Sequence, residues 1–284
     1  MQKKQNTIGV FDSGIGGLTV ARTIASHLPN ESLVYFGDTA HLPYGDKSAD
    51  AIRFFSLKIA KFLLDKGCKC IVVACNSATS TSINVLQEFF GDKVPIIGTV
   101  EPLTEYISQQ LSQQLSQQPS QSITERRFKK IGIIGTKATI GSGMYEKSLH
   151  AKQHTLEVVS LATPLLVPMI EEGFFQNNIS KTIIHNYLEN SYLQNIDTLL
   201  LACTHYPLIR KEIEAYYKGA VKVFDSNMPV ALEVERVLRE SDSLSDLKSA
   251  PHRFFVSDYT ESFAETTRLF WGEETVHLEK CAIF

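Results

Sequence analysis

Two stretches of this chain share one design, an apolar run that ends in a cysteine and passes at once into polar residues. Residues 71–80 read IVVACNSATS, and residues 199–207 read LLLACTHYP. Four or five consecutive apolar residues predict a strand buried on both faces of a parallel sheet. The Ser/Thr cluster beyond the first run predicts a helix over residues 80–90, and the proline beyond the second predicts another helix start. The design therefore favours an α/β fold with mainly parallel central sheets.

A second pair of stretches is also similar. Residues 8–14 read IGVFDSG and residues 131–136 read IGIIGT, and each precedes its cysteine stretch by a similar length of chain. This spacing indicates one duplicated α/β unit, whose equivalent positions we expect on opposite sides of a pseudo-twofold axis. We predict a discontinuous first domain of residues 1–98 and 225–284 and a second domain of residues 99–224, with the active site between them.

Cys75 and Cys203 end the two cysteine runs, so we expect each at the carboxyl end of a strand, where open α/β sheets bind ligands. Each would face the N-terminus of a helix, whose free N–H groups favour negative charge. We therefore predict that the pKa of both thiols lies below the usual value of about 8.5. A thiolate and a thiol on opposite faces of one carbon form an acid/base pair. The alternative is that both cysteines are small buried residues without chemistry.

Composition narrows the function classes. The chain has 284 residues, is 43% hydrophobic and carries a net charge of −3, which gives no reason to expect nucleic-acid binding. The apolar run from Ile8 stops at Asp12, too early for a signal peptide or a membrane span, so we expect no membrane association.

The cysteine pattern also points to a compartment. Five cysteines form an odd set without disulfide-framework spacing, which predicts a cytoplasmic protein. Cys68, Cys70 and Cys75 lie close together in sequence, but their spacing matches no standard zinc or redox motif, so no metal is expected.

Two loops follow predicted strands and hold candidate binding residues. The glycine-rich loop DSGIGG contains Asp12 and Ser13 and matches neither the P-loop nor the dinucleotide fingerprint. It is either a tight strand-to-helix turn or a set of N–H groups that holds a carboxylate. Residues 37–45, GDTAHLPYG, form a long loop that is either a substrate wall or a structural turn.

Two further residues are candidates for acid/base chemistry. Glu171 follows an apolar run, and it is either a solvated acid or an inward-pointing hydrogen-bond partner for a base. His205 lies two residues beyond Cys203. Either it lies at the N-cap of a helix without a chemical role, or its imidazole positions or polarises the neighbouring group.

A Gln-rich insert occupies residues 108–122, in which the tripeptide SQQ occurs three times. Ile107, Leu111 and Leu115 are four residues apart, so the segment either extends a helix that ends before Pro119 or forms a disordered insert. We assign it no chemistry.

Six motifs together resemble the glutamate racemase family, in order and over nearly the whole chain. They are GVFDSGIGGLTV, YFGDTAHLPYGDKS, IVVACNSATS, IGIIGTKATIGSGMY, PLLVPMIEEG and LLLACTHYPLI. The resemblance implies a cofactor-independent isomerase that supplies D-glutamate for peptidoglycan, and hence for cell-wall biogenesis and cell shape. It also implies two α/β domains around a buried glutamate, and a homodimer. The Gln-rich insert has no counterpart in the family pattern.

The resemblance also implies roles for individual residues. Cys75 would take the α-proton from D-glutamate and Cys203 would take it from L-glutamate, with Asp12, Glu171 and His205 assisting the thiols. The residues implied in substrate binding are Asp12, Ser13, Pro43, Tyr44, Gly45, Asn76, Ser77, Thr204 and His205.

Other functions remain open on the sequence. An aspartate or hydantoin racemase would share the paired cysteines, although the loops DSGIGG and CTHYP favour glutamate. A non-catalytic two-domain ligand-binding protein with inert cysteines is a second class. A redox thiol pair is disfavoured by the absence of C-x-x-C. No lysine motif for a Schiff base is apparent, in agreement with a route that uses no cofactor.

Overall fold

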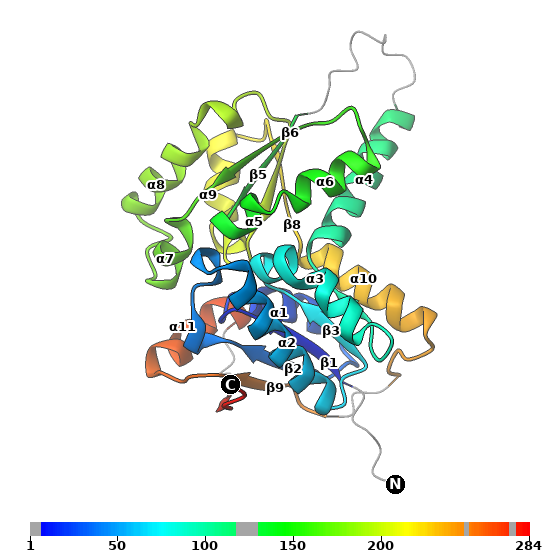
Figure 1. Ribbon diagram of the computed structural model, residues 1–284. Helices are drawn as coiled ribbons and strands as arrows, with labels where there is room; N and C mark the ends of the chain where they lie inside the picture. The colour runs from blue at the N-terminus through cyan, green and yellow to red at the C-terminus, as the bar shows by residue number, and fades with distance from the viewer. Residues whose placement is uncertain (1–6, 118–129, 247–249, 273–276) are drawn as a thin grey trace. The chain divides into compact units, whose positions relative to one another are not determined.

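The computed structural model describes residues 7–117, 130–246, 250–272 and 277–284. The chain divides into two compact units, one formed by Met1–Thr99 with Asn227–Phe284 and the other by Val100–Ser226. Each unit is built on a parallel sheet with helices around it, which confirms the predicted α/β class (Figure 1).

The first sheet is formed by strands from both parts of its unit. They are β1 (Ile8–Asp12), β2 (Leu33–Gly37), β3 (Cys70–Val73), β4 (Ile96–Ile97), β9 (Arg253–Val256) and β10 (Leu278–Lys280). Their order is β10-β9-β2-β1-β3-β4, and all neighbours run parallel. β1, β2 and β3 are buried along their whole length, as their unbroken apolar character predicts.

The helices of the first unit cover both faces of this sheet. They are α1 (Leu18–His27), α2 (Ala49–Asp65), α3 (Asn76–Phe90), α10 (Asn227–Glu240) and α11 (Glu261–Trp271), with short 3-10 helices η1 (Thr39–His41) and η2 (Tyr44–Asp46). The chain crosses from β1 to β2 and then back to β3, so right-handed crossovers place α1 and α2 on opposite faces. α2 packs with α3, and α1 packs with α10 and α11 (Figure 1).

The start of α3 differs from the prediction. The helix begins at Asn76 and not at residue 80, because Cys75 itself is the N-cap and its Sγ accepts a hydrogen bond from the Ala78 N–H at 3.4 Å. The Ser/Thr cluster lies inside the helix, where Thr79 and Thr81 donate to backbone carbonyl groups at 2.8 and 2.7 Å.

The second sheet is formed by β5 (Lys130–Gly135), β6 (Glu157–Ala162), β7 (Thr198–Ala202) and β8 (Lys222–Asp225). Its order is β6-β5-β7-β8, and all neighbours run parallel. This is the order of β2-β1-β3-β4 in the first unit, so β1 corresponds to β5 and β3 corresponds to β7. The topology agrees with the duplicated unit that the repeated motifs indicate.

The helices of the second unit also lie on two faces. They are α4 (Val100–Gln117), α5 (Lys137–Gly141), α6 (Met144–Lys152), α7 (Leu166–Glu171), α8 (Asn178–Leu188) and α9 (Arg210–Tyr217), with 3-10 helices η3 (Ser191–Leu193) and η4 (Tyr206–Ile209). α4 packs with α6 on one side of the sheet, and α8 packs with α9 on the other (Figure 1).

The Gln-rich segment is helical as far as the structure describes it. α4 continues to Gln117, and Ile107 and Leu111 are buried in the core of the second unit together with Tyr145 and Leu149. The helical interpretation is therefore confirmed for residues 108–117, and residues 118–122 lie outside the described part of the chain.

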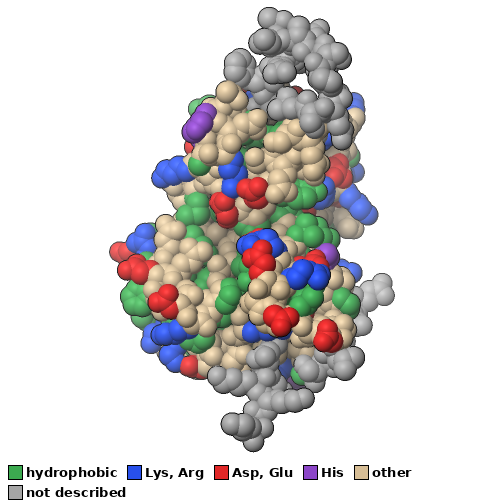
Figure 2. All heavy atoms as spheres, turned by 90° about the vertical axis from the view of Figure 1, so that its right-hand side faces the viewer, with side chains coloured by type: hydrophobic (Ala, Val, Ile, Leu, Met, Phe, Trp, Pro, Cys, Tyr) green, Lys and Arg blue, Asp and Glu red, His purple; other side chains and the backbone are tan. Residues whose placement is uncertain are grey.

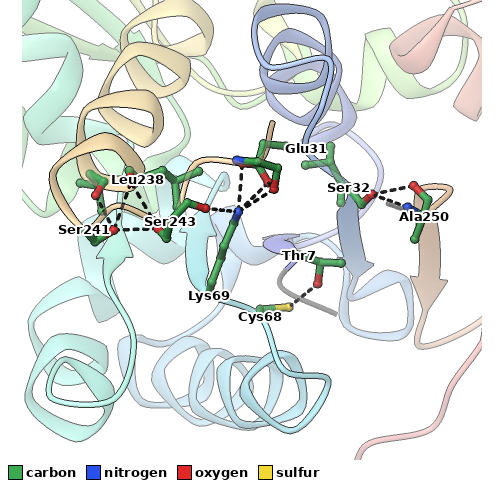
Figure 3. A network of polar contacts seen from close by, with 12 residues as sticks. Thr7, Glu31, Ser32, Cys68, Lys69, Leu238, Ser241, Ser243 and Ala250 are labelled. Atoms are coloured by element: carbon green, nitrogen blue, oxygen red, sulfur yellow. Dashed lines mark hydrogen bonds and ion pairs between the residues drawn. The ribbon is translucent and has the colours of Figure 1, made fainter. Parts of the chain in front are cut away.

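A buried ion pair joins distant segments at the amino-terminal ends of the first sheet's strands (Figure 3). Lys69 Nζ lies 2.8 Å from Glu31 Oε2, and the two side chains are 8% and 1% exposed. Lys69 also donates to the Ser243 carbonyl oxygen at 2.5 Å, and the Ser245 N–H donates to Glu31 at 2.8 Å. The pair therefore holds the segment after α10 against the starts of β2 and β3.

The surface carries both charge signs. On the face that Figure 2 shows, acidic and basic side chains are interspersed and neither gathers into one large patch. Among the described residues, no helix is both long and apolar enough to cross a membrane.

Candidate active site

The first unit brings Cys75 and Ser13 together. They follow β3 and β1, which are neighbouring parallel strands, so their carboxyl ends meet at one edge of the sheet. The Cys75 thiol donates to Ser13 Oγ at 3.6 Å and accepts from the Ala78 N–H at 3.4 Å. Only 5% of Cys75 is exposed, so the thiol is nearly buried.

The glycine-rich loop positions Asp12 beside this thiol. Asp12 is fully buried, and its Oδ2 accepts a hydrogen bond from the Gly14 N–H at 3.1 Å. The Tyr35 hydroxyl donates to the Gly14 carbonyl oxygen at 2.8 Å. A Cβ at Gly37 would clash with that same oxygen, and one at Gly17 would lie 2.5 Å from Asp12 Cβ. The tight-turn interpretation accounts for these contacts.

The protonation of Cys75 differs from the prediction. Burial and the negative charge on Asp12 raise the pKa of the thiol to about 12, although the hydrogen bonds from Ala78 and with Ser13 act in the opposite direction. The predicted lowering by the helix N-terminus is therefore wrong for Cys75, because desolvation and a neighbouring carboxylate outweigh it. In the free protein Cys75 is a thiol at neutral pH.

Asn76 and Ser77 begin α3 beside Cys75 and are 2% and 3% exposed. The Thr99 hydroxyl donates to Asn76 Oδ1 at 3.0 Å, which fixes the direction of the Asn76 amide. The Thr99 N–H is itself bound to Thr79 Oγ1 at 3.3 Å. Asn76 is thus held in one orientation at the helix start.

The loop of residues 38–46 holds further candidate binding residues of the first unit. Tyr44 is 1% exposed, and its hydroxyl donates to Asp38 Oδ2 at 2.6 Å. Burial and the negative charge of Asp38 raise the pKa of Tyr44 well above its usual value, and the charges of Cys75 and Asp12 add to this. Tyr44 is therefore close enough to Cys75 and Asp12 for their charges to affect its pKa. Pro43 and Gly45 are its neighbours in sequence.

Asp38 is a residue that the sequence reasoning missed. It is fully buried, and its Oδ1 accepts from the Ser257 hydroxyl at 2.7 Å and lies 2.8 Å from His41 Nδ1. Its own N–H donates to the Asp12 carbonyl oxygen at 3.0 Å. An acid directly after β2, beside the strand that ends in Asp12, was the available signal.

The second unit holds Cys203 in the equivalent place, after β7. Cys203, Thr204 and His205 are all buried, with 7%, 4% and 3% exposed. Cys203 Sγ lies 3.7 Å from His205 Nδ1, and His205 Nε2 lies 2.9 Å from Glu171 Oε1. Glu171 ends α7 and points to His205, so these three side chains form a continuous polar chain.

His205 has a strongly shifted pKa. Burial opposes its positive charge, but the hydrogen bonds to Cys203 and to Glu171 outweigh burial and raise the pKa to about 10. At neutral pH the imidazole is therefore protonated beside the Cys203 sulfur. The two thiols thus have opposite surroundings, because a carboxylate lies near Cys75 and a cation lies near Cys203.

Tyr206 anchors the loop that carries Cys203. Its ring is fully buried, and its hydroxyl lies 2.6 Å from Thr163 Oγ1, just beyond the end of β6. The loop is thereby tied to the neighbouring part of the sheet edge. Thr163 and Tyr206 were not singled out from the sequence, since a Tyr-Pro pair after a strand also suits an ordinary turn.

Within the described residues, no group of three or more His, Cys, Asp and Glu side chains is arranged to hold a metal ion. All five cysteines are free, and Cys281 is the least buried of them.

Comparison with known proteins identifies the family. Residues 17–232 match the family described as Asp/Glu/Hydantoin racemase. The chain belongs to this family. The glutamate racemase of Chlorobaculum tepidum is 38% identical to it over 274 residues, which cover 96% of this chain and 94% of that relative.

Solved structures of this racemase family agree. The crystal structure of glutamate racemase from Francisella tularensis in complex with D-glutamate has a TM-score of 0.87 and 34% identity, and the match covers 99% of both chains. Glutamate racemase from Thermus thermophilus, in complex with beta-chloro-D-alanine, has a TM-score of 0.82 and 34% identity and covers 99% of this chain and 98% of its own. The predicted resemblance to glutamate racemase is confirmed.

Proposed function

We propose that this protein interconverts L-glutamate and D-glutamate by moving the α-proton between Cys75 and Cys203, without a cofactor. One observation carries the thiol assignment: the two cysteines follow equivalent strands of the two units. Each thiol has one charged neighbour, a carboxylate for Cys75 and an imidazolium for Cys203. The glutamate racemases that resemble the chain over nearly its whole length support the reaction and the substrate.

The charges beside the two thiols suit one direction of reaction. With L-glutamate bound, the Cys203 sulfur beside protonated His205 takes the α-proton, and the Cys75 thiol delivers its proton to the opposite face of Cα. The product is D-glutamate, and the two thiols have exchanged roles, so the enzyme is then set for the reverse direction. Glu171 keeps His205 charged and oriented during the transfer.

Stabilisation of the intermediate falls to polar groups near the thiols. The α-proton of an amino acid is very weakly acidic, so donors must hold the carboxylate where negative charge develops. The residues that we assign to binding are Asp12, Ser13, Pro43, Tyr44, Gly45, Asn76, Ser77, Thr204 and His205. Buried donors are effective here, because water does not compete for the same oxygens.

Cysteine variants test the mechanism. We expect Cys75→Ala and Cys203→Ala each to abolish racemisation in both directions, measured by circular dichroism or polarimetry from pure L- and pure D-glutamate. The matched control is Cys281→Ala, which removes a partly exposed thiol that we give no role and is expected to keep full activity. Full turnover in both directions by either of the first two variants would reject the two-thiol scheme.

A substrate panel tests the specificity. We expect turnover of glutamate and no comparable turnover of aspartate or a hydantoin. Faster turnover of aspartate would reassign the substrate within the same family. Slow iodoacetamide labelling of Cys75 and Cys203 that glutamate does not change, together with no racemisation, would favour the ligand-binding alternative.

We further propose that the protein acts in the cytoplasm as a homodimer, supplies D-glutamate for peptidoglycan, and consists of the two domains 1–98 with 225–284 and 99–224. Five free thiols suit a reducing compartment. The family resemblance supports the dimer and the biosynthetic role. Light scattering coupled to size exclusion measures the oligomeric state, and a purely monomeric protein would reject the dimer.

A further inference from the structure

An aromatic cluster holds His41, which belongs to the loop of residues 38–46. The His41 ring stacks on Phe55 with ring centroids 4.2 Å apart, and Phe284 meets it edge-on at 4.7 Å. Phe284 also contacts Phe55 edge-on at 5.5 Å. His41 is thus fixed between two aromatic rings, and 29% of its side chain remains exposed.

The same histidine is tied to Tyr44 through one carboxylate. His41 Nδ1 lies 2.8 Å from Asp38 Oδ1, and the Tyr44 hydroxyl donates to Asp38 Oδ2 at 2.6 Å. Asp38 is fully buried and cannot exchange these partners for water without rearrangement. A displacement of the His41 ring therefore changes the carboxylate that orients Tyr44.

The sheet edge explains how Phe284 reaches this loop. Beyond β10, the Cys281 N–H donates to the Val256 carbonyl oxygen at 2.9 Å, which continues the pairing with β9. Beyond β9, Ser257 Oγ accepts from the Ala40 N–H at 2.9 Å. Two adjacent segments at the carboxyl edge of the sheet thus contact the same loop, one by hydrogen bonds and the other by the ring of Phe284.

We infer that Phe284 is a positioning residue for substrate binding, which acts through His41 on the loop that carries Pro43, Tyr44 and Gly45. The inference rests on the proposed function, in which this loop binds glutamate. Because 45% of Phe284 is exposed, its ring adds little to the buried core. Its removal therefore affects the shape of the loop more than the folding of the unit.

Steady-state kinetics of Phe284→Ala test the inference. We expect KM for both enantiomers of glutamate to rise about three- to tenfold, because an aromatic pair that fixes a binding loop is lost. We expect kcat to stay within about twofold, because the thiols and their partners are unchanged. Phe284→Tyr keeps the ring and is expected to restore KM to within about twofold of the wild-type value.

Three further variants make the test specific. Phe89→Ala removes an aromatic ring that is 60% exposed on α3 and is expected to leave KM unchanged. In a His41→Ala background, Phe284→Ala is expected to add much less than it does alone, because the side chain through which it acts is already missing. Phe284→Leu keeps apolar bulk without a ring and is expected to retain the raised KM.

The outcomes separate this inference from the proposed function. An active wild-type enzyme whose KM is unchanged by Phe284→Ala overturns the inference alone. A loss of kcat and of thermal stability that Phe284→Tyr does not restore overturns it too, because that pattern shows general packing. A wild-type protein that does not racemise glutamate overturns the proposed function itself.

Discussion

At the scale of single residues, Cys75 shows how two local effects compete. As the N-cap of α3 it receives the Ala78 N–H, which favours a thiolate, yet burial and Asp12 raise its pKa to about 12. The sequence pattern correctly predicted a strand end and a helix beyond the thiol. It could not predict the depth of burial or the distance to the carboxylate of Asp12, because both depend on tertiary packing.

The charge on His205 gives a pH-dependent prediction. Its pKa is raised to about 10, so we expect its ring carbons to show the imidazolium chemical shift in NMR spectra up to about pH 9. A group whose pKa is raised on folding stabilises the protein fully below the unfolded value of about 6.5 and loses this effect as pH rises through about 10. The contribution of His205 to the free energy of unfolding therefore decreases as the pH rises from about 6.5 to about 10.

Glu171→Gln is the matched variant for this measurement. It removes the carboxylate 2.9 Å from His205 Nε2 and keeps an acceptor oxygen of similar shape. We expect the pKa of His205 in the folded protein to fall, so its charge contributes less stability and the loss of that stability is complete at a lower pH. Titration of the wild-type ring near pH 6.5 would contradict the proposed charge on His205.

At the scale of elements, the strands were more predictable than the helix starts. β5 and β7 were recognisable because several apolar residues follow each other in sequence. Such a run is typical of a strand in a parallel sheet whose two faces are both covered by helices. The start of α3 was placed too late because a Ser/Thr cluster is a common cap signal, whereas here these side chains bond to carbonyl groups of the preceding turn and strand. A cysteine is an uncommon N-cap, so the pattern pointed elsewhere.

The Gln-rich end of α4 gives a prediction about stability. Leu111 is 4% exposed in the core of the second unit, so Leu111→Ala is expected to lower the free energy of unfolding by about 2–4 kcal/mol in urea titrations. Ser112→Ala, one residue further on the exposed side of the same helix, is expected to change it by less than about 0.5 kcal/mol. Equal effects of the two changes would show that α4 does not pack against the core of the second unit through Leu111.

At the scale of the whole molecule, the ion pair of Lys69 and Glu31 joins parts of the first unit that are far apart in sequence. Lys69→Met leaves Glu31 buried without its cation, so we expect a loss of about 3–5 kcal/mol in the free energy of unfolding. Lys61→Met is the matched control, because Lys61 pairs with Asp65 on the surface and is 59% exposed. We expect that change to cost less than about 1 kcal/mol, measured by the same urea titration.

A second variant distinguishes the pair from the lysine alone. Replacing both partners, as Lys69→Met with Glu31→Leu, is expected to recover part of the lost stability, because no unpaired charge then remains buried. If Lys69→Met costs no more than Lys61→Met, the buried pair does not hold the segment after α10. The sequence could not reveal this pair, since Glu31 and Lys69 are charged residues of types that are usually solvated.

The first unit is formed by two separate segments of the chain, and this has a consequence for biosynthesis. Strands β9 and β10 are encoded after the entire second unit, and β9 is the neighbour of β2 in the finished sheet. While a ribosome is still translating the middle of the message, the nascent β2 therefore has one open edge, whereas every strand of the second sheet is synthesised before α10. A chaperone that recognises exposed strand edges would accordingly find its target in the earliest part of the polypeptide, which is the last to be completed.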